Sequence, residues 1–181
     1  TDWVQVDANG RAPSIIRKEN GNVISDLTFT KGSFGYQYGS WNGYAPYTTS
    51  WTDGTPTESR EASTTRNALG IYGSNGYVEF SVPAKDYEQT LTLSLGAFAC
   101  DCKLETWLES DPDNKTTNTV SSTDLVPNAT HTHKTNLGAK IITVKFSSTA
   151  ENDKLVVRYT TETANQQGLI QAIALNDPNV V

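Results

Sequence analysis

The chain has 181 residues, a formal net charge of −6 and no methionine, a length that fits one domain or at most two small ones. It contains no apolar run of the roughly 18 residues needed to cross a bilayer, and no Lys/Arg cluster of the kind that nucleic-acid binding requires. Thr (25), Ser (15), Asn (14) and Gly (13) are abundant, and this balance favours strands and turns over helices.

Short runs with strand character recur along the chain, separated by turn residues. The first two are residues 14–17 and 22–30. They flank Asn20-Gly21, a dipeptide typical of the type I′ turn that closes a β-hairpin. Residues 32–56 follow and are rich in glycine and aromatic rings, a composition that disfavours a continuous buried strand.

Alternation of apolar and polar residues is clearest in the middle of the chain. Residues 68–72 form a short apolar run, and residues 77–82 and 90–95 alternate with a period of two, so every second side chain is predicted to face the core. Those side chains are Val78, Phe80, Val82, Leu91, Leu93 and Leu95. Residues 96–102 are interpreted as a turn, and residues 103–110 as a further strand with Leu104, Thr106 and Leu108 on one face.

The last third of the chain continues the same pattern. Residues 111–123 are polar and interpreted as a turn, whereas residues 140–146, 154–160 and 168–175 are predicted strands. In the last strand Ile170, Ala172 and Ala174 alternate with Leu169, Gln171, Ile173 and Leu175. No window shows a sustained 3.6-residue apolar stripe. The sequence therefore predicts an all-β fold, a single antiparallel β-sandwich or jelly roll over residues 1–181.

Candidate catalytic groups are sparse. Glycoside hydrolysis needs two carboxylates that flank one bond, and Glu79, Glu105 and Glu109 are the acids on predicted strands. Each lies on the face opposite the apolar one, so we interpret them as solvated charge. His131 and His133 could share one side of a strand, but no acid or cysteine lies close in sequence, and a solvated loop pair is favoured. Motifs of serine hydrolases, zinc proteases and nucleotide-binding loops are absent.

Two further features bear on cofactors and redox state. Cys100 and Cys102 could close a small disulfide or remain thiols, and we favour two reduced thiols because they are too few for a disulfide scaffold. Asp111, Asp113 and Asn114 offer the oxygen ligands that Ca²⁺ prefers, without a full EF-hand pattern; no other cofactor is expected. The start at Thr1, with neither Met nor a signal peptide, points to a mature or excised fragment of a longer protein.

The most informative segment for binding runs from residue 34 to residue 51 and is dense in aromatic residues, glycine and polar amides. Flat rings can cover the apolar C–H patches of a sugar, while amides meet its hydroxyls. Alternatively, the rings pack the end of the sandwich, and Trp51 is the one expected to face the core. The residues predicted to bind a ligand are Tyr36, Tyr38, Trp41, Asn42, Tyr44 and Tyr47.

Four strings carry a resemblance to a known type of domain: residues 50–57 (SWTDGTPT), 75–84 (NGYVEFSVPA), 91–96 (LTLSLG) and 103–108 (KLETWL). They resemble accessory β-sandwich domains of secreted bacterial polysaccharide-degrading enzymes, and are similar to carbohydrate-binding modules with the galactose-binding-like jelly roll. The similarity covers roughly residues 50–175 and implies a non-catalytic, extracellular or cell-surface module, linked covalently to a catalytic domain, that binds a polysaccharide or oligosaccharide. It supplies no ligand set that maps onto these residues.

Three hypotheses follow, in order of preference. The first is a carbohydrate-binding module that uses ring stacking and hydrogen bonds. The second is a structural or adhesive surface domain, in which the aromatic rings are buried and no glycan binds. The third is a small glycoside hydrolase or lyase that depends on Glu79, Glu105 or a histidine. Fold alone does not decide among them.

Overall fold

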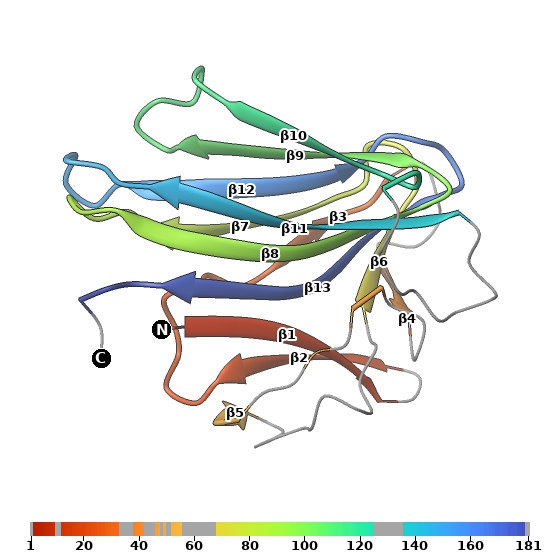
Figure 1. Cartoon of the computed structure of the whole chain (residues 1–181), viewed down its shortest axis with the longest axis horizontal. Coiled ribbons are helices and arrows are strands. Elements are labelled where there is room, and N and C mark those ends of the chain that lie inside the picture. Colours follow the sequence, from red (N-terminus) through yellow and green to blue (C-terminus); the bar gives the residue numbers. More distant parts are fainter. Residues whose placement is uncertain are drawn as a thin grey trace.

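In the computed structural model the chain is described over residues 2–9, 12–32, 38–41, 46–47, 49, 52–55, 68–124 and 136–179. Within these ranges the regular elements are all strands, and they form two antiparallel sheets that face each other (Figure 1). The predicted all-β antiparallel sandwich is therefore confirmed. The described residues form no helix that is long and apolar enough to cross a membrane.

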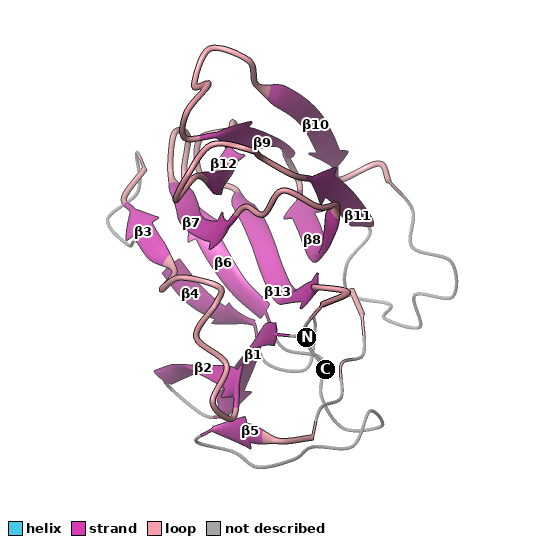
Figure 2. Cartoon of the chain, turned by 90° about the vertical axis from the view of Figure 1, so that its left-hand side faces the viewer, coloured by secondary structure: helices cyan, strands magenta, loops and turns pink. Residues whose placement is uncertain are grey.

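The larger sheet has eight strands among the described residues. Its order is β11 (Leu137–Phe146), β8 (Gln89–Phe98), β13 (Gln167–Asn176), β1 (Asp2–Asn9), β2 (Ala12–Lys18) and β5 (Gly54–Thr55), and β6 (Ala68–Tyr72) joins β13 and pairs with β4 (Tyr38–Trp41). The smaller sheet has five described strands, in the order β10 (Thr116–Ser121), β9 (Asp101–Leu108), β12 (Lys154–Thr161), β7 (Tyr77–Pro83) and β3 (Thr28–Thr30). Figure 2 shows both sheets from the side.

The core lies between the two sheets and is made by the side chains that the alternation predicted. Leu91, Leu93 and Leu95 from β8 are fully buried, and they belong to the same buried cluster as Val78 and Val82 from β7. Removing one such side chain from water contributes about 1.5–3 kcal/mol. The repeated apolar face of each strand is therefore what holds the sheets together.

Buried hydrogen bonds also join the two sheets, among them one from Tyr159 and one from Thr161 to the carbonyl of Ile71. Tyr159 from β12 is almost fully buried, and its hydroxyl donates to the backbone oxygen of Gly96 in β8 over 2.7 Å. Burial raises the pKa of this hydroxyl well above its ordinary value, so the phenol keeps the proton that it donates. A buried hydroxyl with a partner adds directional specificity to an otherwise apolar interface.

The predicted hairpin at Asn20-Gly21 does not form. Asn20 does adopt the left-handed conformation, with φ of 60°, but the chain leaves β2 in one sheet and enters β3 in the other. Residues 22–27, expected to be strand, cross between the sheets instead. Their backbone is bonded by side chains: Asp2 accepts from the N–H groups of Val23 and Ile24, and Arg17 donates to the carbonyls of Ile24 and Ser25.

Two other predicted turns are corrected by the structure. The expected turn at residues 96–102 is confined to residues 99–100, where Ala99 has a φ of 53°, because β8 continues to Phe98 and β9 begins at Asp101. The polar stretch at residues 111–123 contains a strand, β10. Strands β1, β4 and β5 were not predicted, although Val4 and Val6 in β1 are buried.

The alternation predicted for residues 168–175 is wrong in placing Ile170 on the same face as Ala172 and Ala174, although Ile173 and Leu175 do alternate with those alanines. A β-bulge interrupts the pairing of β13 with β8 between Ile170 and Ala172. Because the extra residue changes which side chains face inward, Ile170 and Ile173 both lie in the core. Gln171 is left at the bulge with its side chain fully buried.

Candidate functional site

A cleft opens between the two sheets where their edge strands diverge. The edges are β10 and β11, and at one end they are in contact: the N–H of Ala139 donates to the carbonyl of Asp124, and Lys140 donates to the carbonyl of Thr119. Only glycine fits at Gly138, since a Cβ there would lie 1.9 Å from the carbonyl oxygen of Ser121. Toward the other end of β11 the edges separate, leaving a cleft of about 480 Å³.

An ion pair secures the closed end. Lys140 lies 2.9 Å from the carboxylate of Asp124. Burial acts to raise the pKa of Asp124, but the hydrogen bonds from the Ser121 N–H and from Lys140 outweigh it and hold the pKa below its ordinary value. The carboxylate is therefore charged at neutral pH, and its ion pair with Lys140 at the closed end persists.

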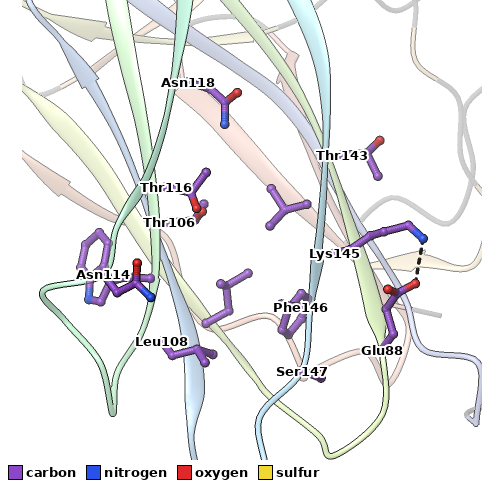
Figure 3. Close-up of a pocket in the computed structure, with 13 residues that line it drawn as sticks. Glu88, Thr106, Leu108, Asn114, Thr116, Asn118, Thr143, Lys145, Phe146 and Ser147 are labelled. Atoms are coloured by element: carbon purple, nitrogen blue, oxygen red, sulfur yellow. Dashed lines mark hydrogen bonds and ion pairs between the residues drawn. The ribbon is translucent and has the colours of Figure 1, made fainter.

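Polar side chains on the β10 side of the cleft face apolar side chains from β11 and β12, although Leu108 of β9 and Thr143 and Ser147 on the β11 side depart from this division (Figure 3). Uncharged hydroxyl and amide side chains come from β9, β10 and the turn between them: Thr106, Asn114, Thr116 and Asn118. Apolar side chains come from β9, β11 and β12: Leu108, Val144, Phe146 and Leu155. Trp107 also borders the cleft. Such a pairing of walls suits a ligand with hydroxyls on one side and C–H groups on another.

The polar wall results from a change of pattern along β9 and β10. Near the closed end, the inward positions are apolar, with Cys102 and Val120 paired across the two strands and buried. Near the open end, the paired inward residues are Thr106 and Thr116, and Thr106 is only 4% exposed. Polar residues at core-facing positions break the binary pattern of a sandwich, and such breaks tend to occur at functional sites.

Charge in the cleft is confined to its mouth. Lys145 lies 2.8 Å from Glu88, and both side chains are well exposed. Of the described residues that line the cleft, Glu88 is the single carboxylate. The described residues that line the cleft therefore do not supply the two facing carboxylates that glycoside hydrolysis requires.

The predicted aromatic site falls largely outside the described residues. Tyr36, Asn42 and Tyr44 lie outside them, as do Trp51, His131 and His133. Tyr38 and Trp41 are the first and last residues of β4, which pairs with β6, and their side chains are not among those described. Tyr47 is described and half-buried.

Tyr47 is fixed at a different place from the cleft. Its backbone exchanges two hydrogen bonds with the side chain of Gln171, and the preceding Pro46 packs over Gly96 on the outer face of the eight-stranded sheet. Burial, and secondarily the charge of Asp124, raise the pKa of Tyr47. The structure thus sets Tyr47 toward the closed end of β11, whereas the cleft opens at the end that contains Phe146.

The predicted calcium ligands lie in the turn between β9 and β10. Asp111, Asp113 and Asn114 are all exposed there, and Asn114 faces the cleft. Across the described ranges no three His, Cys, Asp or Glu side chains gather into a group that could hold a metal ion. The calcium site remains a prediction.

The acids interpreted as surface charge are found in ion pairs. Glu79 on β7 lies 2.6 Å from Arg158, and Glu105 on β9 lies 3.6 Å from Lys103. The guanidinium of Arg158 is also stacked 4.5 Å from the ring of Tyr77. These contacts lie on the outer face of the five-stranded sheet, as the alternation predicted.

No protein-family model matches the chain, and no curated protein matches it either. Among solved structures, the chain is similar to the module TmCBM61 in complex with β-1,4-galactotriose, with a TM-score of 0.50, 10% identity, and coverage of 84% of this chain and 88% of that one. The enzymatically active domain of tailspike protein 4 from bacteriophage CBA120 has a TM-score of 0.48 and 7% identity, and covers 86% of this chain and 19% of that one. A family 35 carbohydrate-binding module from Clostridium thermocellum has a TM-score of 0.37 and 10% identity, over 83% and 98%.

These likenesses concern the fold. At 10% identity and a TM-score of 0.50, the chain shares the β-sandwich architecture of a carbohydrate-binding module. The resemblance stated from the four sequence strings is confirmed at that level.

Proposed function

We propose that this chain is a non-catalytic glycan-binding module and that the β10–β11 cleft holds the saccharide. The observation that carries the proposal is the facing of uncharged amides and hydroxyls by apolar side chains across one cleft. A sugar ring presents hydroxyls around its rim and C–H groups on its faces, so both walls find partners. The fold shared with TmCBM61, whose structure holds β-1,4-galactotriose, supports the same class of ligand.

The chemistry of the cleft favours a neutral glycan. Asn114 and Asn118 can each donate and accept hydrogen bonds, while Leu108 and Val144, which are only partly buried, offer apolar surface to a ring face. The charged groups at the mouth, Glu88 and Lys145, already neutralise each other. A volume of about 480 Å³ falls within the usual range of small-ligand sites, about 300–1,000 Å³. Affinity of such an open, polar site is on the order of μM to mM.

The aromatic segment is a second part of the proposal. The rings of Tyr36, Tyr38, Trp41, Tyr44 and Tyr47 add stacking and Asn42 adds hydrogen bonds, so that one glycan chain contacts the module twice or two chains bind independently. Because weak contacts on one polymer reinforce each other through effective concentration, this arrangement raises the retention on polysaccharide above the affinity for a short oligosaccharide.

The setting of the module follows from the resemblance. The module is proposed to be extracellular or at the cell surface and to be linked covalently to an enzyme that degrades polysaccharide. There, even weak binding keeps the enzyme near its insoluble substrate. Catalysis by the module itself is disfavoured, because the described lining of the cleft offers one carboxylate, held by Lys145.

A glycan microarray with the isolated chain tests the proposal, followed by calorimetry on the strongest ligand and an assay for new reducing ends. Binding to a neutral oligosaccharide without release of reducing ends is expected. A blank array supports the structural or adhesive alternative and overturns glycan binding. Release of reducing ends overturns the non-catalytic assignment.

A further inference from the structure

Two thiols lie in contact at the end of the sandwich where β8 turns into β9. The sulfur atoms of Cys100 and Cys102 are 3.5 Å apart. Both cysteines are free and buried, Cys102 completely and Cys100 with 5% of its surface exposed. Neither side chain takes part in the cleft, and neither is used by the proposed function.

Local backbone geometry brings the sulfurs together. Cα atoms two residues apart along an extended strand are about 6.4–6.8 Å apart, which reaches the upper end of the roughly 4.4–6.8 Å that a disulfide spans. Here the chain bends at residues 99–100, the carbonyl of Cys100 accepts from Ser122, and both side chains point to the same spot. The backbone is therefore already arranged for a bridge between the two sulfurs.

The two thiols differ in access and in chemistry. Cys100 donates to the carbonyl of Gln167 over 3.3 Å and lies nearer the surface. The hydrogen bond with Cys102 lowers the pKa of Cys100, and the same contact together with burial raises the pKa of Cys102. Since the thiolate is the reactive form, Cys100 is the first to react and Cys102 supplies its proton later.

Packing around Cys102 excludes large reactants. A Cβ added at Gly168 would lie 3.0 Å from the sulfur of Cys102 and 3.1 Å from the ring of Tyr159. No space is left there for a second protein thiol or for a glutathione molecule, so the near sulfur of Cys100 is the partner within reach.

We propose that Cys100 and Cys102 are a peroxide-oxidisable pair that closes to an intramolecular disulfide. The Cys100 thiolate attacks one peroxide oxygen, an S–O bond forms, the O–O bond breaks, and the departing hydroxide takes a proton to become water. The Cys102 sulfur then attacks the sulfenic sulfur of Cys100, the S–S bond forms, the S–O bond breaks, and the hydroxide leaves as water with the Cys102 proton. In sum, two thiols and one hydrogen peroxide give one disulfide and two waters.

Intact mass spectrometry of the folded protein, before and after hydrogen peroxide, tests the proposal. The expected product is a monomer lighter by about 2 Da, with both thiols lost together to alkylation under denaturing conditions and restored by a reductant. Peptide mapping of the same wild-type sample should show the Cys100–Cys102 bridge. Disulfide-linked dimers, or a protein that keeps both thiols, would overturn the proposal.

Single variants establish the order of the two steps. In Cys102→Ser, which keeps a hydroxyl that can donate to the Cys100 sulfur, peroxide should leave a sulfenic acid on Cys100 that dimedone traps. In Cys100→Ser, the remaining thiol should react at least tenfold more slowly while the protein is folded. Equal reactivity of the two variants contradicts the assigned roles, and circular dichroism of each variant confirms that the fold is retained.

Discussion

Gln171 and Tyr47 exchange two hydrogen bonds although 124 residues separate them in sequence. The N–H of Tyr47 donates to the Gln171 side-chain oxygen over 3.0 Å, and the Gln171 amide nitrogen donates to the Tyr47 carbonyl over 2.9 Å. The side-chain amide thus acts as a strand partner for one residue. It is available for this because the bulge in β13 frees Gln171 from the alternation.

Replacing Gln171 should therefore loosen the aromatic segment at its anchor. Gln171→Leu leaves the Tyr47 N–H and carbonyl without these partners in a half-buried place, which costs about 1–3 kcal/mol of unfolding free energy. Urea denaturation measures the difference. Asn176→Ala, an amide at the exposed end of the same strand, serves as the control and should change stability by less than about 0.5 kcal/mol. Equal effects of the two variants would show that the Gln171 contact adds no stability.

The polar wall of the cleft predicts a face-specific effect on binding. Thr116→Val keeps the shape of the side chain and removes the hydroxyl that faces the cleft, so the affinity for the array ligand should fall about two- to tenfold. Thr117→Val makes the same change on the neighbouring residue of β10, which is paired with Glu105 on the outer face, and should leave affinity unchanged. Calorimetry on both variants decides; parallel losses would argue against a site in the cleft.

The aromatic segment predicts a second, separable loss. Trp41→Ala and Tyr44→Ala should each weaken binding to polysaccharide by about two- to tenfold, since one stacked ring contributes about 0.5–1.5 kcal/mol. Tyr77→Ala is the control, because Tyr77 stacks with Arg158 on the outer face of the other sheet. Affinity electrophoresis measures the retention. If both segment variants are retained like the wild type, stacking by this segment is wrong.

Acid should destabilise the protein through Asp153. This buried carboxylate accepts hydrogen bonds from Ser110, from Ser148 and from the N–H of Lys154. Burial acts to raise its pKa, but these bonds lower the pKa from 3.8 to about 2. A lowered folded-state pKa stabilises the protein above the unfolded value, and the contribution is lost as pH falls from about 4 to about 2.

Urea denaturation between pH 5 and pH 2 measures this contribution, which we expect to be on the order of 1–2 kcal/mol. Asp153→Asn should be less stable than the wild type at pH 5 and should lose less stability on acidification. Asp113→Asn, at an exposed carboxylate, should follow the wild-type curve. A wild-type protein whose stability does not fall between pH 4 and pH 2 would contradict the role of Asp153.

Where side chains alternate strictly, the sequence was enough to predict the fold. Leu91, Leu93 and Leu95 were expected in the core and are fully buried there, because a period of two has one consistent solution in a sandwich. The position of Gln171 at the bulge could not be predicted in this way. An inserted residue changes the phase of the strand, and the alternation of single residues carries no sign of it.

Long-range pairing was also beyond the sequence. Asn20 has the left-handed conformation that the dipeptide predicts. The backbone of residues 22–27 nevertheless crosses to the other sheet, where Asp2 and Arg17 form hydrogen bonds with Ile24. Those contacts join residues up to 22 positions apart. No turn propensity contains that information.

The same polar residues that make the cleft a candidate site also hid it from the sequence analysis. Thr116 and Asn118 are polar where a core-facing strand is normally apolar, so residues 111–123 were interpreted as a turn. The threonines at residues 116, 117 and 119 carry strand propensity, and this was the signal that could have revealed β10. Opposing strands must be known before Phe146 can be placed across from Thr116.

An NMR titration of the ¹⁵N-labelled chain with the array ligand tests whether the saccharide binds between β10 and β11. We expect saturable shifts of the backbone amides of residues 114–118 and of Phe146, with β7 and the exposed end of β13 unchanged. Saturable shifts that avoid both sides of the cleft, or none at ligand concentrations up to several mM, would contradict a saccharide site between β10 and β11.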